Sequence, residues 1–224
     1  SSYYYEASLN YNRTFREKHN ITGLLVGVLR ENKSGGASSI QTSLPARNIG
    51  LSGRFTYAYD GRYFAEANFG YNGSERFAKN ERFGLFPSIG AGWMISEEKF
   101  WNQDLKNIIN KLKLKGTYGL VGNDNIGAWN DRFFYMSEVN LNGSGANFSW
   151  GQDFERNVGT IDMIRYRNDK IKWEIAQKMN LGLEVGLFNI FDIQFDYFTE
   201  YRKNIFGERQ TIPYEMGFSA PLYA

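Results

Sequence analysis

Residue types that carry covalent chemistry are scarce in this sequence. His19 is the only histidine, and cysteine is absent. A Ser-His-Asp triad would have to use this one histidine, and neither the HExxH pattern of zinc proteases nor a P-loop occurs. Because His19 lies in the polar segment 16–20, we expect it to be a solvated turn residue. We expect no catalytic residue, no metal site and no bound cofactor.

Two small polar clusters offer alternatives to this expectation. Glu97 and Glu98 are neighbours, and adjacent side chains on a helix do not face each other. We therefore interpret them as acidic charges at the start of a helix that Ser96 caps. Asn123, Asp124 and the residue after them offer oxygen ligands for Ca²⁺, but without the spacing of a known calcium loop. Ordinary loop structure is favoured there, and bound calcium remains the alternative.

Three lysines fall on one face of a predicted strand, at positions 111, 113 and 115. The nearby alternating segment carries Lys172, Glu174 and Lys178, so opposite charges are interspersed. We interpret this face as a hydrated wall. A basic patch that selects substrate is the alternative.

The longest regular pattern in the chain is an alternation of apolar and polar residues from Ile171 to Leu187. A period of two residues is typical of a β-strand with one apolar and one polar face. Strands in soluble domains have about 5–6 residues, whereas this one alternates over about 17, and roughly 9–11 suffice to cross a bilayer. After a turn at 189–191 the alternation resumes at Ile193. We predict two long strands of a transmembrane β-barrel wall, with odd positions facing lipid and even positions facing a wet interior. The predicted lipid-facing residues include Leu181, Leu183, Val185 and Leu187.

Shorter segments repeat this alternation along the chain. We predict strands over 3–12, 21–30, 47–59, 63–72, 86–95 and 112–120, which with the two long strands make eight. Residues 96–110 have helical spacing, and 133–140 could pair with 147–152 across a turn at 142–145. Tight or compact connections (16–20, 60–61, 96–110 and 189–191) alternate with long ones (31–46, 72–82, 122–169 and 207 onward). Outer-membrane barrels place short turns on the periplasmic side and long loops outside.

Aromatic residues make up 17% of the chain. Five lie near predicted strand ends, where membrane-interface girdles belong: Tyr57, Tyr59, Tyr63, Tyr71 and Trp93. Four others lie in the irregular region and are candidates for contact with a ligand or a lid, the alternative being packing of the loop against itself: Trp129, Tyr135, Phe148 and Trp150.

Composition excludes several other classes. No run of about 18 apolar residues occurs, so the sequence predicts no transmembrane helix. The formal net charge of +2 is too small to indicate a nucleic-acid partner. The chain starts in strand pattern at Ser1 and stops in a predicted loop at Ala224. Because lipid tolerates no open sheet edge, we expect residues 1–224 to be part of one larger barrel domain whose plug and closing strands lie elsewhere.

Three motifs carry a resemblance to a known family. They are RFGLFPSIGAGW from Arg82 with ISEE from Ile95, then LKLK from Leu112 with YGLVGND from Tyr118, and KWE from Lys172 with LGL and GLFN up to Asn189. In this order they resemble the SusC/RagA family of TonB-dependent outer-membrane transporters, and essentially the whole chain is similar to the middle of that family's C-terminal barrel.

The resemblance implies a plugged barrel of about 22 strands in the bacterial outer membrane. It also implies uptake of oligosaccharides or peptides, energy delivered by TonB, and a SusD-like surface lipoprotein as lid. A small self-contained outer-membrane barrel with an adhesion or structural role is the alternative function. An outer-membrane hydrolase is a third possibility, for which His19 would be the only histidine.

Overall fold

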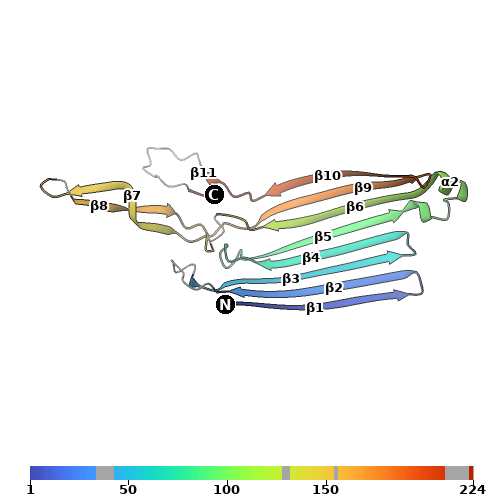
Figure 1. The fold of residues 1–224 in the computed structure, drawn as a ribbon, viewed down its shortest axis with the longest axis horizontal. Helices are drawn as coiled ribbons and strands as arrows, with labels where there is room; N and C mark the ends of the chain where they lie inside the picture. Colours follow the sequence, from blue (N-terminus) through green and yellow to red (C-terminus); the bar gives the residue numbers. More distant parts are fainter. Residues whose placement is uncertain (34–42, 128–131, 154–155, 210–221, 224) are drawn as a thin grey trace.

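A single antiparallel sheet of eight long strands dominates the structure (Figure 1). The computed structural model describes residues 1–33, 43–127, 132–153, 156–209 and 222–223. The strands of this sheet, in spatial order, are β1 (Ser2–Phe15), β2 (His19–Asn32), β3 (Ala46–Tyr59), β4 (Tyr63–Gly73), β5 (Phe83–Met94), β6 (Ile109–Asn123), β9 (Glu174–Leu187) and β10 (Phe191–Lys203). The predicted number of long strands and their antiparallel arrangement are thereby confirmed.

Smaller elements complete the chain. A 3-10 helix η1 (Ile95–Glu97) and the short helix α2 (Gln103–Ile108) connect β5 to β6. Strands β7 (Glu138–Trp150) and β8 (Arg156–Arg165) pair in a separate two-stranded sheet, and β11 (Glu208–Arg209) pairs with β12 (Leu222–Tyr223). Within the part of the chain that is described, no helix is long and apolar enough to cross a membrane.

The connections alternate in length from one end of the sheet to the other. The turns after β1, β3 and β9 and the η1–α2 connector all lie at one end, and the N-terminus and the long connections lie at the other (Figure 1). At the first of these ends, Asp60 (φ 52°) and Gly61 (φ 68°) adopt the left-handed conformation that tight hairpin turns need. We refer below to the turn end and the loop end of the sheet.

The two faces of the sheet differ in polarity as the alternation predicted. From Tyr63 to Tyr71 in β4, and throughout β5, the odd residues are exposed and the even ones half-buried. Leu114 lies opposite Trp93 on one side and Leu183 on the other, so these apolar side chains share one face. Lys115 lies opposite Gly92 and Gly182 on the other face. We refer to these as the apolar face and the polar face.

The compact hydrophobic core lies at the loop end and not within the sheet. Its buried members are Phe77, Ile126, Phe134, Ile171 and Trp173, and Phe86 and Phe206 pack against them. We call these seven residues the loop cluster. They come from five connections or strand ends, so the loop cluster joins segments far apart in the sequence.

Three predictions about local structure were wrong. Strand β5 ends at Met94, and Ile95 begins η1. The cap of α2 is Asn102, whose side chain accepts a hydrogen bond from the Leu105 amide at 3.0 Å, and Ser96 makes no cap. Most of 147–152 belongs to β7, the same strand as residues 138–140, and the partner of β7 is β8. The Asn-Gly-Ser-Gly segment 142–145 lies inside β7, where the pairing with β8 shifts register.

Candidate solute-facing wall and outer loops

The polar face carries its charges as pairs between neighbouring strands. Glu184 of β9 lies 2.8 Å from the Nζ of Lys111 and 3.0 Å from that of Lys115, both on β6. Lys115 also lies 3.6 Å from Asp196 of β10. Two of the three lysines predicted to share a face are therefore neutralised by carboxylates of the next strands, as expected for a hydrated wall.

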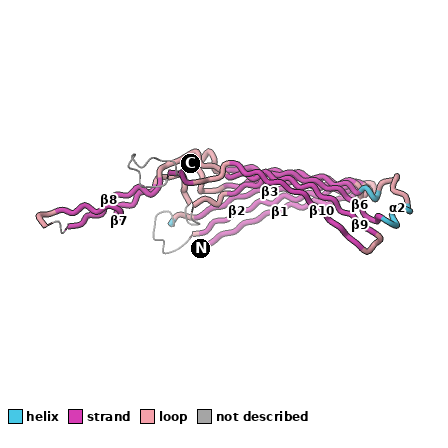
Figure 2. The backbone as a smooth tube through the Cα atoms, turned by 90° about the horizontal axis from the view of Figure 1, so that it is seen from above, coloured by secondary structure: helices cyan, strands magenta, loops and turns pink. Residues whose placement is uncertain are grey.

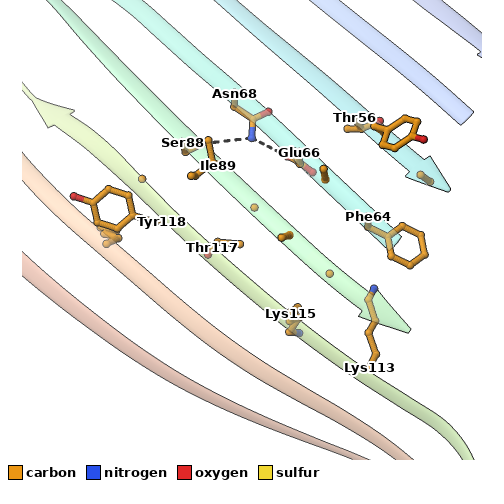
Figure 3. A pocket seen from close by; sticks show the side chains of 18 of the residues that line it. Thr56, Phe64, Glu66, Asn68, Ser88, Ile89, Lys113, Lys115, Thr117 and Tyr118 are labelled. Atoms are coloured by element: carbon orange, nitrogen blue, oxygen red, sulfur yellow. Dashed lines mark hydrogen bonds between the residues drawn. The ribbon is translucent and has the colours of Figure 1, made fainter. Parts of the chain in front are cut away.

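A shallow groove of about 510 Å³ runs along the polar face between β4 and β6 (Figure 3). It exists because the strand between them, β5, presents Ser88, Gly90 and Gly92 there in place of large side chains. The walls are formed by Phe64, Glu66 and Asn68 on one side and Lys113, Lys115 and Thr117 on the other.

The side chains around the groove hold one another in place. Asn68 donates a hydrogen bond to Glu66 at 2.8 Å, and Arg54 donates another to the same carboxylate at 2.9 Å. The ammonium of Lys113 lies 5.0 Å from the centre of the Phe64 ring, within cation–π range. The groove thus offers one aromatic ring beside fixed groups of both charges, a lining suited to passing contact with a polar solute.

Trp173 is the centre of the loop cluster. Its ring centre lies 5.2 Å from that of Phe77 and 5.1 Å from that of Phe86, and its Nε1 donates to the carbonyl of Arg82 at 3.3 Å. The prediction that Ile171 and Trp173 lie on the lipid-facing side of a strand was therefore wrong. Strand β9 begins at Glu174, and both residues are buried among the loops.

Two arginines bind the loops together around this core. Arg76 donates to the carbonyls of Asp124 and Ile126 at 3.2 and 2.6 Å. Arg132 donates to the carbonyls of Leu44 and Pro45, each at 2.6 Å, and forms an ion pair with Glu75. The connections before β3, after β4 and after β6 are thereby fastened to one another.

The predicted ligand or lid contacts can be placed only in part. Trp129 lies outside the described residues. Phe148 and Trp150 belong to β7, but their side chains are likewise outside the part that the structure describes. Tyr135 is half-buried, and its carbonyl accepts a hydrogen bond from the amide of Asn168 at 3.0 Å.

Glu98 has a role at the turn end that the sequence analysis missed. It accepts hydrogen bonds from Tyr63, from Trp93 at 3.0 Å and from Arg62 at 3.2 Å. The hydrogen bond from Tyr63, followed by that from Trp93, holds the pKa of Glu98 below its ordinary value. The interpretation of Glu98 as a helix N-terminal charge was wrong, since it precedes α2 and binds two strands instead.

Asp60 extends this network along the turns. It forms an ion pair with Arg62, whose hydrogen bond lowers the pKa of the Asp60 carboxyl, and its amide donates to the carbonyl of Lys18 at 2.7 Å. Arg62 thus links Asp60 to Glu98. The three successive turn-end connections, after β1, β3 and β5, form one polar network.

His19 begins strand β2, so its prediction as a solvated turn residue was wrong. Its Nδ1 lies 2.8 Å from the hydroxyl of Tyr57, and its ring centre lies 4.8 Å from that of Tyr59. The contact forms because His19 is opposite Tyr59 in the β2–β3 pairing. The histidine therefore belongs to a group of aromatic side chains at the turn end.

The five predicted interface aromatics lie at the two ends of the sheet. Tyr57, Tyr59, Tyr63 and Trp93 are at the turn end of β3, β4 and β5. Tyr71 is near the loop end, where its ring stacks on that of Phe83 with centres 5.3 Å apart. Their role as interface girdles stays a prediction.

The polar cluster that begins at Asn123, considered above as a possible calcium site, makes hydrogen bonds within its own loop and to β9. The side-chain oxygen of Asn123 accepts from the Asn125 amide at 3.0 Å, and its side-chain nitrogen donates to Glu174, also at 3.0 Å. Among the described residues, no three His, Cys, Asp or Glu side chains are grouped so that they could hold a metal ion.

Comparison with protein-family models finds no match, but individual proteins are clearly similar. The chain is 33% identical to the TonB-dependent receptor SusC of Bacteroides thetaiotaomicron over 151 residues, which is 66% of the chain and 14% of that receptor. It is 27% identical to the TonB-dependent receptor P39 of Formosa agariphila, over 96% of the chain and 21% of the receptor. The chain thus spans less than a quarter of the length of these relatives.

Solved structures agree with the sequence comparison. The RagAB peptide importer in its closed-closed state matches 99% of the chain with a TM-score of 0.72 and 21% identity, covering 25% of the matched chain. The open-open state of the same importer matches with a TM-score of 0.69 and 21% identity, over all of this chain and 26% of the matched one. The sheet is therefore that of a TonB-dependent receptor, and the chain belongs to the SusC/RagA family of these receptors.

Proposed function

We propose that residues 1–224 form part of the barrel wall, with its outer loops, of a SusC-type importer that takes up nutrients across the bacterial outer membrane. The observation that carries this proposal is the opposite polarity of the two faces. Leu85 and Ile89 on the apolar face are 58% and 62% exposed, while the polar face carries the ion pairs of Glu184. A wall between lipid and water needs this arrangement. The apolar face, with Leu181, Leu183, Val185 and Leu187, is then the lipid contact.

The two outermost strands support membership of a larger barrel. In the described residues, β1 pairs with β2 alone and β10 with β9 alone, so each leaves one edge of backbone donors and acceptors for a further strand. Hydrocarbon offers no replacement for those hydrogen bonds. We assign the missing neighbouring strands to other parts of the same barrel domain, and the plug domain to another part of the receptor.

The loop end is the proposed meeting place with outside partners. The chain has the fold of part of the RagAB peptide importer, and it is similar in sequence to the receptor SusC. We assign to the outer loops the contact with an oligosaccharide or peptide and with a SusD-like surface lipoprotein, including Trp129, Tyr135, Phe148 and Trp150. We assign the contact with TonB to parts of the receptor outside these residues.

Cysteine labelling in permeabilised cells tests the face assignment. Leu183→Cys on the apolar face and Asn180→Cys on the polar face are introduced into the full-length receptor, in a background without other reactive cysteine. We expect a membrane-impermeant, water-soluble maleimide to modify Asn180→Cys in permeabilised cells, and a lipid-soluble maleimide to modify Leu183→Cys. Water-soluble labelling of Leu183→Cys would overturn the proposal.

A direct uptake measurement tests the activity. Cells that lack the receptor gene should lose growth on, or accumulation of, one class of oligosaccharide or peptide, and the full-length gene should restore it. Restoration by a receptor with its TonB-contacting segment removed would contradict TonB-dependent import.

A further inference from the structure

Strands β7 and β8 form an arm that extends away from the sheet at the loop end (Figures 1 and 2). They pair with each other and form a sheet of their own. A two-stranded hairpin is at best marginally stable alone in water. Contacts between the base of the arm and the rest of the chain are therefore needed to hold the arm in one direction.

At the base of the arm, one residue of β7 lies directly opposite one residue of β8. Arg165 is the last residue of β8 and lies opposite Glu138, the first residue of β7. Arg165 is only 4% exposed, which is rare for this residue type. Its Nη2 donates to the Glu138 carboxylate at 3.1 Å, and its Nε donates to the carbonyl of Met136 at 3.2 Å.

The same guanidinium joins the arm to the loop cluster. Its central carbon lies 4.2 Å from the centre of the Phe134 ring, and Phe134 is 3% exposed. Phe134 also packs nearly perpendicular to the Phe206 ring, with centres 5.1 Å apart and an angle of 86° between the ring planes. One side chain therefore contacts both strands of the arm and a residue held in the core.

Arginine is suited to this position for two physical reasons. A buried charge is costly unless it is paired and hydrogen-bonded, and here a carboxylate, a carbonyl and an aromatic face surround it. The flat guanidinium can stack on a ring while its donors point in fixed directions, which the ammonium of lysine cannot do. A lysine would keep the charge but lose the geometry.

We propose that Arg165 is a positioning residue that sets the direction of the β7–β8 arm relative to the barrel wall. The ion pair with Glu138 joins the two strands of the arm to each other. Rotation of the arm about its base would break the contacts of Arg165 with Met136 or Phe134, which both precede β7. The arm exposes aliphatic side chains, with Leu141 71% and Ile161 69% exposed, and a fixed direction presents them at one place outside the wall. The assignment of that place to ligand or lid contact rests on the proposed function; the positioning itself does not.

The test is a distance measurement in the full-length receptor in outer-membrane vesicles. Nitroxide labels are placed at Asp153→Cys on the arm and Lys33→Cys at the loop end of the wall, both exposed positions. We expect one narrow distance distribution for the parent protein and a broader or displaced one for Arg165→Lys. Arg167→Lys is the matched control, because Arg167 is 70% exposed and bonds Asp169, two residues away. An Arg165→Lys distribution equal to that of the parent would overturn the proposal.

Two additions keep the test decisive. If Arg165→Lys does not give a folded, heat-modifiable barrel, then Glu138→Gln and Phe134→Leu, which each weaken one contact, should broaden the distribution to a smaller extent. Uptake is measured in parallel. A broadened distribution with unchanged uptake would support the positioning role and contradict the role of the arm in import, whereas a loss of uptake with an unchanged distribution would refute the positioning role.

Discussion

The Nζ of Lys115 lies 3.0 Å from the Oε1 of Glu184, across the boundary where β6 pairs with β9. These residues are 69 positions apart in the chain, because the β7–β8 arm and its connections are inserted between the two strands. The same carboxylate holds Lys111. Within the described eight-stranded sheet, β6 and β9 are the only neighbouring strands that do not follow each other in sequence, and the ion pairs of Glu184 continue the polar face across this boundary.

Glu184→Gln should destabilise the wall slightly and in a salt-dependent manner. Its partners are partly exposed, so each ion pair contributes about 0.2–1 kcal/mol. We expect the free energy of unfolding, measured by urea titration in lipid vesicles, to fall at an ionic strength of about 0.01 M and to be nearly unchanged at about 1 M. An equal loss of unfolding free energy at both ionic strengths would show that the ion pairs of Glu184 do not stabilise the wall through charge.

Leu183→Arg should be far more damaging than a change of the same kind on the polar face. Leu183 lies between Leu114 and Phe195 on the apolar face, and arginine near the middle of a bilayer costs about 2–4 kcal/mol in a barrel wall. Asn180→Arg on the polar face should change the same unfolding free energy by only about 0.5 kcal/mol. Equal costs for the two variants would contradict the face assignment.

Glu98 should make the turn end sensitive to acid. Its pKa in the folded protein is lowered from an ordinary 4.5, so the folded state binds this proton less readily than the unfolded state. The stabilisation is present above pH 4.5 and is lost as the pH falls below it. We expect the stability advantage of the parent protein over Glu98→Gln to shrink as the pH falls below 4.5. Glu97→Gln, which alters an exposed pair with Lys106, is the control. A stability difference between the parent protein and Glu98→Gln that does not change with pH would contradict a stabilising role for the ionised Glu98 carboxylate.

Trp173→Ala should loosen the outer loops while leaving the wall intact. Replacing a buried Trp by Ala costs about 3–5 kcal/mol, and here the loss falls on the loop cluster. We expect faster cleavage of the loops by added protease in intact cells, with unchanged heat-modifiable migration of the barrel. Trp173→Phe, which keeps a ring between Phe77 and Phe86, should be cleaved at a rate close to the parent's. Loss of the folded barrel in Trp173→Ala would show that the cluster and wall are not separable.

Much of the wall could be predicted because the signals that specify its strands and turns involve residues close together in the sequence. Alternation specifies which side chains share a face, and the turn at Asp60 and Gly61 specifies a hairpin from two residues. The positions of most long strands and the alternation of short and long connections followed from these signals.

The loop end could not be predicted in the same way. Ile171 and Trp173 continue the alternation of β9 in the sequence, yet the structure buries them against Phe77. Periodicity cannot distinguish an apolar side chain that faces lipid from one that enters a nearby core. Glu98 accepts hydrogen bonds from Tyr63 and Trp93 because β4 and β5 pair and bring these two side chains together. The residues next to Glu98 in the sequence do not indicate that pairing.

The distance in sequence between the members of the loop cluster has a consequence for the order of assembly. Hairpins such as β3–β4 close over a few residues, whereas the contact of Phe77 with Trp173 joins positions that β5, β6 and the whole arm separate. Closing a long loop has a greater entropic cost than closing a short one. We therefore expect the hairpins of the wall to form before the loop cluster, which requires that β9 already be paired with β6.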